Sequence, residues 1–467
     1  MFKKAFLAML VLEGLSLLSF FFPYLAKPLL ALLFVLTLVL AWRKFEWGIY
    51  ILFAELFVGS RGHLLEASVG FVPVSLRLVI FFAVIVGAGR LVLADRSSAW
   101  ATLKQLPISF WFLVLAVVAG IGIGFASGHP TASVFLDANG YLFLAVIPLV
   151  LLAVKDRDGI MRLLDILAAA VLVIALQTLA AFVWFRFSLP GVAPLYAWIL
   201  GQEIGEITGH VGEASRVFLQ GQFYALVAIF IFAFFRAKQT YYYLIFGAAV
   251  FTVLMSLSRS FWLGAVAGVV FFIILVLGWV RIRFREFLAL AARVALLSLV
   301  AIAAAYLLLS SNASTAGQSL GGRVEDPTQG PAGEARLLLL PGLLDGIQSR
   351  LFLGHGFGKE LSYASFLPDR VTAQNPNGEI RSFAFEWGYL DLALKLGLIG
   401  FLAYFWFLGS IFQLGLEAPA GERLLAAGFL GGLAAICVLN VTTPYLNHPL
   451  GIGYLALSIV TFKALRP

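Results

Sequence analysis

The feature that most constrains this chain is a long series of apolar segments that can cross a lipid bilayer as helices. Spanning a bilayer core takes about 20 apolar residues in helical form. The chain is 62% hydrophobic and only 12% charged, whereas soluble domains average about 45–50% apolar and about 25% charged residues. A transmembrane barrel would need alternating strands of about ten residues, and the sequence lacks that pattern. We therefore expect a polytopic helical membrane protein.

Fourteen apolar runs are candidate spans. They cover residues 5–22, 27–42, 46–60, 76–94, 107–126, 138–154, 163–185, 217–235, 241–258, 260–280, 288–309, 384–411, 424–441 and 450–465. The first follows Lys3-Lys4 but lacks a small-x-small cleavage site, so we expect a retained helix rather than a signal peptide. The run 46–60 is the weakest candidate span, because it carries Glu46 and Glu55. A bundle of twelve spans with two re-entrant or interfacial segments is the alternative.

The distribution of Lys and Arg orients the spans, because cytoplasmic loops carry an excess of both residues. With a cytoplasmic N-terminus, one set of loops contains Arg43-Lys44, Arg90, Arg96, Lys104, Lys155, Arg157, Arg162, Arg236, Lys238, Arg281, Arg283, Arg285, Arg423, Lys463 and Arg466. The opposite loops keep isolated cations such as Lys27, Arg61 and Arg186. This pattern predicts an even number of spans with both termini in the cytoplasm. It also accounts for most of the net charge of +8 without nucleic acid as a partner.

Cysteine and histidine usage does not indicate metal or disulfide chemistry. Cys437 is the single cysteine, so no intrachain disulfide can form. The histidines are scattered without the spacing of metal ligands; they are His63, His129, His210, His355 and His448. We expect neither a metal nor a cofactor.

The long polar interval 310–386 separates the helices of 1–309 from those of 387–467, and this orientation places it on the outer face of the membrane. Loops of this length are uncommon unless they are functional or disordered. Residues 310–333 are rich in Ser, Gly, Pro and Thr, which predicts a flexible segment. Residues 334–350 have helical spacing and an apolar face, which predicts a helix on the membrane surface. The expected fold is thus an all-α transmembrane bundle of 12–14 spans with one large, partly helical loop on the outer face.

A glycine-rich run, Gly354-His355-Gly356-Phe357-Gly358, lies within this interval. Glycines permit a tight backbone path, and closely spaced amides can approach an anion. A simple turn after a helix is the alternative interpretation.

Two arginines, Arg216 and Arg259, lie at the outer ends of predicted spans on the same side as this interval. An ionisable residue at such depth usually faces an interior or a wet cavity, although a snorkelling side chain at the interface is the alternative. The planar guanidinium donates two parallel charge-assisted hydrogen bonds to phosphate. We interpret the pair as a candidate diphosphate site, with Ser256, Ser258 and Ser260 serving helix packing or extra hydrogen bonds.

Glu386 closes the polar interval and begins the next span. Beside arginines, a carboxylate can accept a proton from an attacking hydroxyl. The alternative is a carboxylate placed there because the helix dipole favours it. Asp391 and Lys395 are four residues apart in the same span, and we predict a structural ion pair between them.

This order of motifs resembles the bacterial O-antigen ligase and O-antigen polymerase superfamily. That family has an arginine opening one span and a Ser-Arg motif at another. Its large periplasmic loop contains an amphipathic helix and a glycine turn, ahead of a helix with Gly-Leu-Ile-Gly. The matching segments here are Arg216, Ser258-Arg259, Arg336 through Gly358, and Glu386 ahead of Gly397-Leu-Ile-Gly400. The resemblance covers roughly residues 210–400.

The resemblance implies inverting, metal-independent glycosyl transfer on the periplasmic side of a bacterial inner membrane. The implied donor is a glycan on undecaprenyl diphosphate, and the implied acceptor is a glycan, lipid A-core or a glycoprotein. Arg216 and Arg259 would then bind the diphosphate and stabilise it as the leaving group. Arg336 would assist from the surface helix.

One position departs from the ligase pattern. Where ligases of the family place a histidine before Gly-Leu-Ile-Gly, this chain has Glu386, which is similar to polymerase-type members. The base is therefore open between Glu386, which we favour, and His355 in the glycine turn. Unassisted attack, with Glu386 only positioning the acceptor, is a further alternative, and the choice between ligase and polymerase stays open.

Two other classes of protein fit less of the sequence. A transporter or flippase for lipid-linked glycans predicts internal repeats and charges deep within several spans. The sequence shows no repeat, and its conspicuous charges lie at the outer ends. A membrane scaffold leaves the paired arginines and the long loop unexplained.

Overall fold

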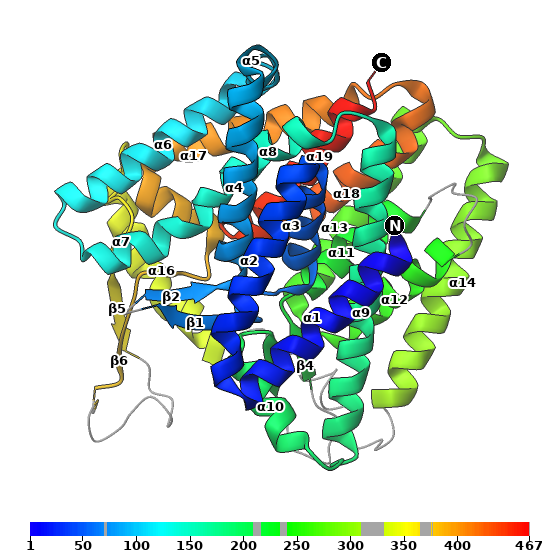
Figure 1. Ribbon diagram of the computed structural model, residues 1–467, viewed down its shortest axis with the longest axis horizontal. Coiled ribbons are helices and arrows are strands. Elements are labelled where there is room, and N and C mark those ends of the chain that lie inside the picture. The colour runs from blue at the N-terminus through cyan, green and yellow to red at the C-terminus, as the bar shows by residue number, and fades with distance from the viewer. Residues whose placement is uncertain are drawn as a thin grey trace.

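The apolar runs fold into long helices packed side by side (Figure 1). The computed structural model describes residues 1–69, 72–208, 216–233, 241–309, 331–364, 375 and 377–466. Its helices are α1 (Phe2–Phe21), α2 (Ala26–Arg43), α3 (Phe45–Val58), α4 (Leu76–Ala94), α5 (Arg96–Leu103), α6 (Ile108–Ala126), α7 (Thr131–Ala138), α8 (Val146–Ala153), α9 (Arg157–Arg186), α10 (Val192–Gly201), α11 (Gln222–Ala233), α12 (Tyr241–Met255), α13 (Arg259–Leu275), α14 (Phe284–Leu309), α16 (Pro331–Ser349), α17 (Gly388–Leu416), α18 (Arg423–Leu439) and α19 (Pro449–Ala464). The prediction of an all-α, multi-pass membrane protein is confirmed.

Within the described residues, fewer helices have the length of a full span than there are apolar runs. Here 10 helical segments are long and apolar enough to cross a membrane. Two of the remaining runs form α3 and α19, which have 14 and 16 residues. At 1.5 Å per residue, these two helices are roughly 21–24 Å long, less than the ~30 Å bilayer core. The other two runs form α11 and α12, whose described parts have 12 and 15 residues and border the segment 234–240, outside the described part of the chain.

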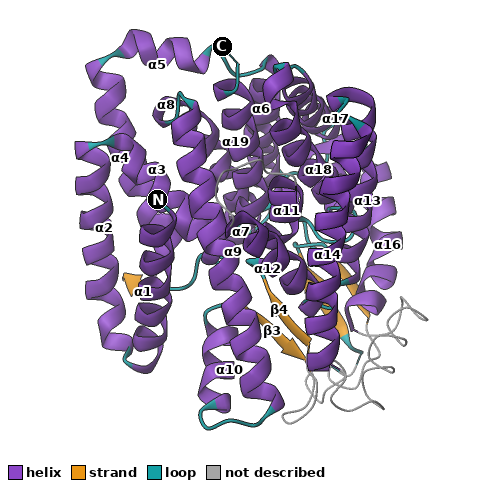
Figure 2. Cartoon of the chain, turned by 90° about the vertical axis from the view of Figure 1, so that its right-hand side faces the viewer, coloured by secondary structure: helices purple, strands orange, loops and turns teal. Residues whose placement is uncertain are grey.

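Within the part of the chain that the structure describes, three antiparallel hairpins interrupt the helices, and none of them was predicted. Their strands are β1 (Glu66–Val69) with β2 (Val72–Ser75), β3 (Gly205–Thr208) with β4 (Arg216–Leu219), and β5 (Leu361–Ala364) with β6 (Glu379–Ser382). Figures 1 and 2 place all three toward the lower end of the bundle, opposite α5 and the C-terminus. We call this the hairpin end. The predicted span 217–235 is corrected here, because its first residues belong to β4 and its helix begins at Gln222.

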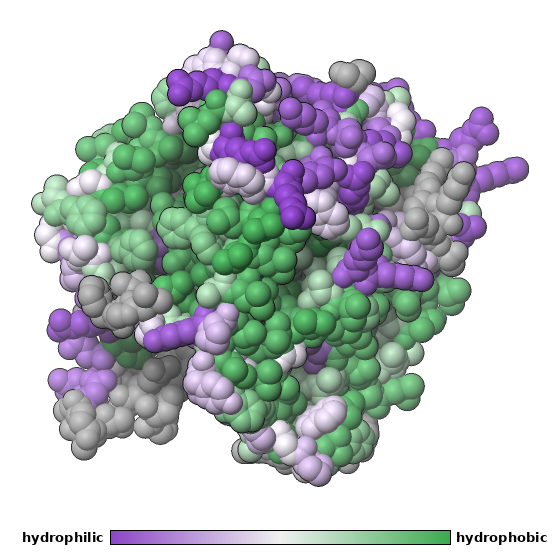
Figure 3. All heavy atoms as spheres, viewed as in Figure 1, coloured by the Kyte–Doolittle hydropathy of each residue, from purple (hydrophilic) through white to green (hydrophobic). Residues whose placement is uncertain are grey.

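The core lies along α9, α11, α18 and α19, whose residues are mostly buried. The outer helices α1, α2 and α14 instead expose Leu and Val side chains. Figure 3 shows an apolar belt with hydrophilic residues gathered over the end opposite the hairpins. This pattern is expected where lipid tails surround the belt.

The charged loops contact other loops that the Lys and Arg pattern predicted to lie on the same side of the membrane. Loops predicted as cytoplasmic meet one another in the pairs Arg162–Glu46 (3.2 Å) and Arg157–Glu422 (3.0 Å). Loops predicted as periplasmic meet in the pair Arg61–Glu203 (3.4 Å) and in a hydrogen bond from Arg350 to Ser127 (3.0 Å). Which end faces the cytoplasm stays a prediction.

A break inside α17 is joined to the glycine-rich turn. Gly397 has φ +64° and interrupts the helix, which leaves backbone groups on both sides without intrahelical partners. The carbonyls of Leu394 and Lys395 accept hydrogen bonds from the amides of His355 and Gly356, each at 2.9 Å. On the far side of the break, the amides of Leu398 and Ile399 donate to the carbonyls of Leu351 (2.8 Å) and Phe352 (3.2 Å).

The same turn inserts into the bundle against α6. The amide of Phe357 donates to the carbonyl of Gly120 at 3.1 Å, and the Phe357 ring is fully buried beside Tyr141. Gly356 has φ +77° and packs directly on the backbone of Gly124. The glycines at both positions allow the two backbones to approach this closely.

We expect Gly356→Ala to lower the stability of the protein by ~2 kcal/mol or more, because alanine at positive φ is strained and overpacking adds to this cost. Its Cβ would lie 2.6 Å from Cα of Gly124. The thermal unfolding temperature of the detergent-solubilised protein measures the effect. Gly409→Ala is the control, because it adds a methyl group to α17 where nothing lies within 4 Å. Equal unfolding temperatures for the two variants would contradict the close packing.

Candidate functional site

Arg216 lies on strand β4 rather than at the start of a span, so that prediction is corrected. The antiparallel register places it opposite Thr208 on β3. Its Nε donates a hydrogen bond to the carbonyl of Ser256 at 3.0 Å, and its guanidinium lies 4.8 Å from the ring centre of Phe218. The hairpin thereby holds Arg216 against the turn between α12 and α13.

Arg259 is the first residue of α13, directly after that turn. The turn is shaped by its serines: Ser256 Oγ donates to the carbonyl of Val253 (2.6 Å) and accepts from the amide of Ser258 (3.2 Å). Within the described part of the chain, the Arg259 guanidinium makes no hydrogen bond or ion pair. Its donors are thus available to a ligand, whereas those of Ser256 and the amide of Ser258 are used within the turn.

Arg336 and Glu386 form an ion pair in which Arg336 Nε lies 2.7 Å from Glu386 Oε2. The side chains are 27% and 48% exposed, so both remain accessible to a ligand. Trp387 Nε1 donates to the carbonyl of Arg336 at 2.9 Å. A small apolar cluster below the pair packs α16 on the start of α17; it includes Leu339, Leu343, Phe385 and Leu394.

The electrostatic surroundings of Glu386 link the ion pair to the β3–β4 hairpin. Burial raises the pKa of Glu386, the positive charge of Arg336 opposes this rise, and the negative charge of Glu206 adds to it. Glu206 lies on β3 opposite Phe218, two residue pairs along the hairpin from the pair of Thr208 and Arg216. The hairpin therefore contributes both a cation and an anion to the site.

The connection between α18 and α19 joins the two halves of the site. Thr443 Oγ1 donates to Ser260 Oγ (3.3 Å) at the start of α13, and Asn447 Nδ2 donates to the carbonyl of Gly388 (3.3 Å) at the start of α17. Tyr445 OH donates to Gln220 Oε1 (3.1 Å) after β4. A continuous set of contacts thus joins the elements that carry Arg216, Arg259, Arg336 and Glu386. Sequence reasoning missed this connection, although residues 440–448 form a polar run between apolar runs on the same side.

The glycine turn does not offer its amides to an anion, and that prediction is wrong. The amides of His355, Gly356 and Phe357 are bonded to carbonyls of α17 and α6. The amide of Gly358 donates to Asp137 Oδ2 at 2.8 Å. Gly354, Gly356 and Gly358 all have positive φ, so their role here is the tight backbone path.

His355 lies apart from the arginines. Its Nε2 is within hydrogen-bonding distance of the carbonyl of Gly346 (2.9 Å) and of Ser349 Oγ (3.1 Å). Gly346 is ~15 Å along α16 from Arg336 at 1.5 Å per residue. Burial lowers the pKa of His355, and the charges of Lys359 and Arg350 lower it further. These contacts favour a structural role for His355.

The predicted ion pair between Asp391 and Lys395 is confirmed, and Asp137 of α7 joins it. All three side chains are almost completely buried. Because Asp137 also accepts from the glycine turn, this triad ties α7, α17 and the turn together. Among the residues that the structure describes, no group of His, Cys, Asp or Glu could hold a metal ion.

Some sequence predictions concern residues outside the described part of the chain. These are His210, Arg236, Lys238 and the segment 310–330, which we predicted to be flexible. Residues 331–333, which we included in that segment, instead begin α16.

The fold defines a multi-pass membrane protein, and its candidate site contains arginines at the hairpin end. A family model described as O-antigen ligase matches residues 243–405. This segment carries Arg259, Arg336, Glu386 and the Gly-Leu-Ile-Gly motif, while Arg216 lies outside it. This match supports the resemblance to the O-antigen ligase and polymerase superfamily that the motifs indicated. No curated protein matches the chain.

We expect Lys395→Met to destabilise the fold by about 3–5 kcal/mol, because removing one partner of a buried ion pair leaves uncompensated charge. Here two buried carboxylates, of Asp137 and Asp391, would lose their cation. The unfolding temperature in detergent measures this loss. Lys104→Met removes an exposed lysine from the opposite end and should change little. A Lys395→Met variant as stable as Lys104→Met would contradict the structural role of the triad.

Proposed function

We propose that this protein transfers a glycan from undecaprenyl diphosphate to an acceptor hydroxyl at the periplasmic face of a bacterial inner membrane. The family match supports a ligase- or polymerase-like glycosyltransferase. The observation that carries the proposal is the set of contacts joining the elements that carry three arginines and one accessible carboxylate at the hairpin end.

Arg216 and Arg259 bind the diphosphate in this proposal. Guanidinium groups match phosphate oxygens with paired, charge-assisted hydrogen bonds. Arg259 has its donors available, and the hydrogen bond from Arg216 Nε to the carbonyl of Ser256 holds Arg216 beside the same turn. As the bond between the anomeric carbon and the diphosphate oxygen breaks, the electron pair moves to the diphosphate. Fixed positive charge at that place stabilises the transition state.

Glu386 acts as the base in this proposal. The acceptor oxygen forms its bond to the anomeric carbon from the face opposite the diphosphate, so the configuration inverts, and its proton passes to the carboxylate. A raised pKa makes a carboxylate a better base near neutral pH, and burial and Glu206 raise that of Glu386. Arg336 holds the carboxylate through the 2.7 Å ion pair before the donor binds, and it then assists with the diphosphate.

Polymerisation of the glycan is the second candidate, and the carboxylate at the position of Glu386 favours it. The two activities differ in the acceptor. Purified protein incubated with lipid-linked oligosaccharide alone lengthens the glycan if it is a polymerase. A ligase forms product only after lipid A-core or an acceptor protein is added.

We expect Arg216→Ala and Arg259→Ala each to reduce the rate of glycan transfer by about 10²–10³-fold, the range seen when one charge-stabilising donor is removed. The assay follows release of undecaprenyl diphosphate from the donor by the purified, folded variants. Arg350→Ala is the matched control, because Arg350 lies at the same end but donates to Ser127. Full activity of both variants would rule out the diphosphate assignment.

The pH profile tests Glu386, which must be deprotonated to act as a base. Activity should fall as pH drops through a pKa above the ordinary glutamate value, because burial and Glu206 raise that pKa. Arg336→Ala removes the cation that lowers the pKa, so the acid limb should move to higher pH. Glu206→Gln removes a negative charge, so the limb should move to lower pH.

Glu386→Gln should cost about 10²–10⁴-fold, as for loss of a general base, and should abolish the acid limb. His355→Ala should retain the acid limb, since His355 contacts Gly346 and Ser349 rather than the proposed site. The measurement is the pH dependence of the maximal rate. A limb that persists in Glu386→Gln and disappears in His355→Ala would place the base in the glycine turn.

A further inference from the structure

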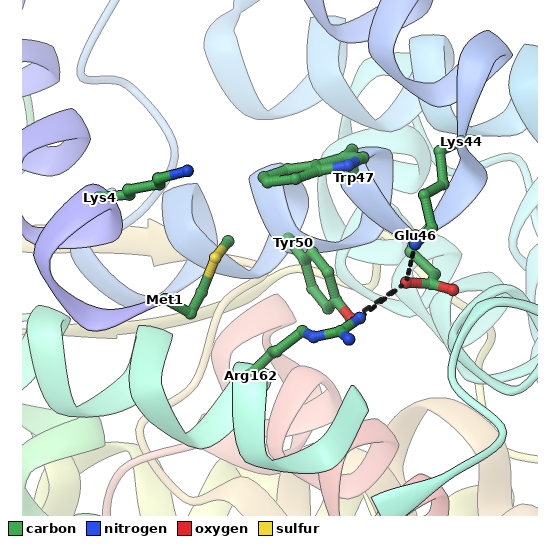
Figure 4. A pocket seen from close by; sticks show the side chains of 7 residues that line it. All are labelled: Met1, Lys4, Lys44, Glu46, Trp47, Tyr50 and Arg162. Carbon is green, nitrogen blue, oxygen red and sulfur yellow. Dashed lines mark hydrogen bonds and ion pairs between the residues drawn. The ribbon is translucent and has the colours of Figure 1, made fainter. Parts of the chain in front are cut away.

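A cationic cavity lies at the end of the bundle opposite the hairpins, and the proposed reaction does not use it. Its volume is about 350 Å³, within the range of small-ligand sites. It is lined by residues from the start of α1, by Lys44 between α2 and α3, by residues of the first two turns of α3, and by Arg162 in the second turn of α9 (Figure 4). These elements belong to the loops predicted as cytoplasmic.

The cavity combines three basic side chains with one acid. Lys44 Nζ lies 3.3 Å and Arg162 Nη1 lies 3.2 Å from the same oxygen of Glu46. Lys4 extends into the cavity from α1 (Figure 4) and makes no hydrogen bond or ion pair within the described residues. One carboxylate therefore faces three cations, which leaves a positive excess in the cavity.

Two aromatic residues of α3 also line the cavity (Figure 4). Trp47 and Tyr50 lie edge to face with ring centres 6.0 Å apart. The Trp47 side chain is partly exposed, and the Tyr50 hydroxyl lies 3.5 Å from Arg162 Nη1. Tryptophan and tyrosine are enriched at the level of lipid headgroups. The neighbouring outward residues of α1, including Leu7 and Val11, are exposed and apolar, as expected for contact with lipid chains.

We propose that this cavity binds the phosphate of an anionic glycerophospholipid. Basic pockets between membrane helices on the cytoplasmic side are suited to anionic headgroups, with electrostatic attraction from each Lys or Arg near the surface. The unpaired amine of Lys4 and the outer nitrogens of Arg162 hold the phosphate. Trp47 packs against the glycerol backbone, and the acyl chains follow the apolar face of α1.

Glu46 competes with a phosphate for Lys44 and Arg162. Substitutions of Lys4 and of Glu46 should therefore change lipid binding in opposite directions. Lys4→Gln should weaken binding of phosphatidylglycerol about fivefold, the value expected for one cation near the surface. Glu46→Gln should strengthen it, because Lys44 and Arg162 then lose their internal counter-ion. Lys3→Gln is the matched control, since it removes the adjacent charge on α1 but does not line the cavity.

Native mass spectrometry of the detergent-solubilised protein, titrated with phosphatidylglycerol or with phosphatidylcholine of the same acyl chains, measures binding. The expected result is preferential binding of phosphatidylglycerol that falls in Lys4→Gln, rises in Glu46→Gln and is unchanged in Lys3→Gln. Equal binding of the two lipids, or equal effects of Lys3→Gln and Lys4→Gln, would overturn the proposal. Displacement of phosphatidylglycerol by an equimolar amount of inorganic phosphate would assign the cavity to free phosphate instead.

Discussion

The structure of the hairpin end depends on the pairing between the broken helix α17 and the glycine turn. Within a membrane an unpaired backbone group costs several kcal/mol, so α17 can break at Gly397 only where other polar groups replace its lost hydrogen bonds. The backbone of residues 351–356 supplies them on both sides of the break. Two short motifs, far apart in the sequence, are therefore one structural unit. This unit ties the segment that follows α16 to the break in α17, and it thereby holds the first part of α17, which follows Glu386, beside α16.

Two ion pairs near this unit differ in burial, and the difference suits their roles. The triad around Lys395 is almost completely buried, and breaking such a pair is costly. The pair between Arg336 and Glu386 is partly exposed, where an ion pair contributes only about 0–1 kcal/mol. The buried triad is therefore suited to hold the scaffold, while the accessible pair can exchange its partners for a ligand at little cost.

Much of the fold followed from apolar run length, because a span must satisfy its backbone within one helix. The pair Asp391–Lys395 could be predicted because residues four apart lie on the same face of one helix. The link between His355 and Leu394 could not be predicted in this way, since nothing in either segment encodes its distant partner. The strands β3 and β4 were missed because four residues are too few to show an alternating pattern, and Arg216 was therefore assigned to a helix end. The sequence still predicted that Arg216, Arg259 and Glu386 lie on the same side of the membrane, because that prediction uses only the charges of the loops.

The arrangement of the arginines bears on how the proposed reaction is timed. Arg336 has two possible anionic partners, Glu386 in the free protein and the diphosphate in the proposed complex. Its charge opposes the rise in the pKa of Glu386. A donor that draws Arg336 away therefore removes that opposition, and the carboxylate becomes a stronger base. Because Arg259 and Arg216 are held by other elements, donor binding does not depend on breaking this pair. In the proposed reaction, the base thus gains its full strength only when the leaving group is already bound.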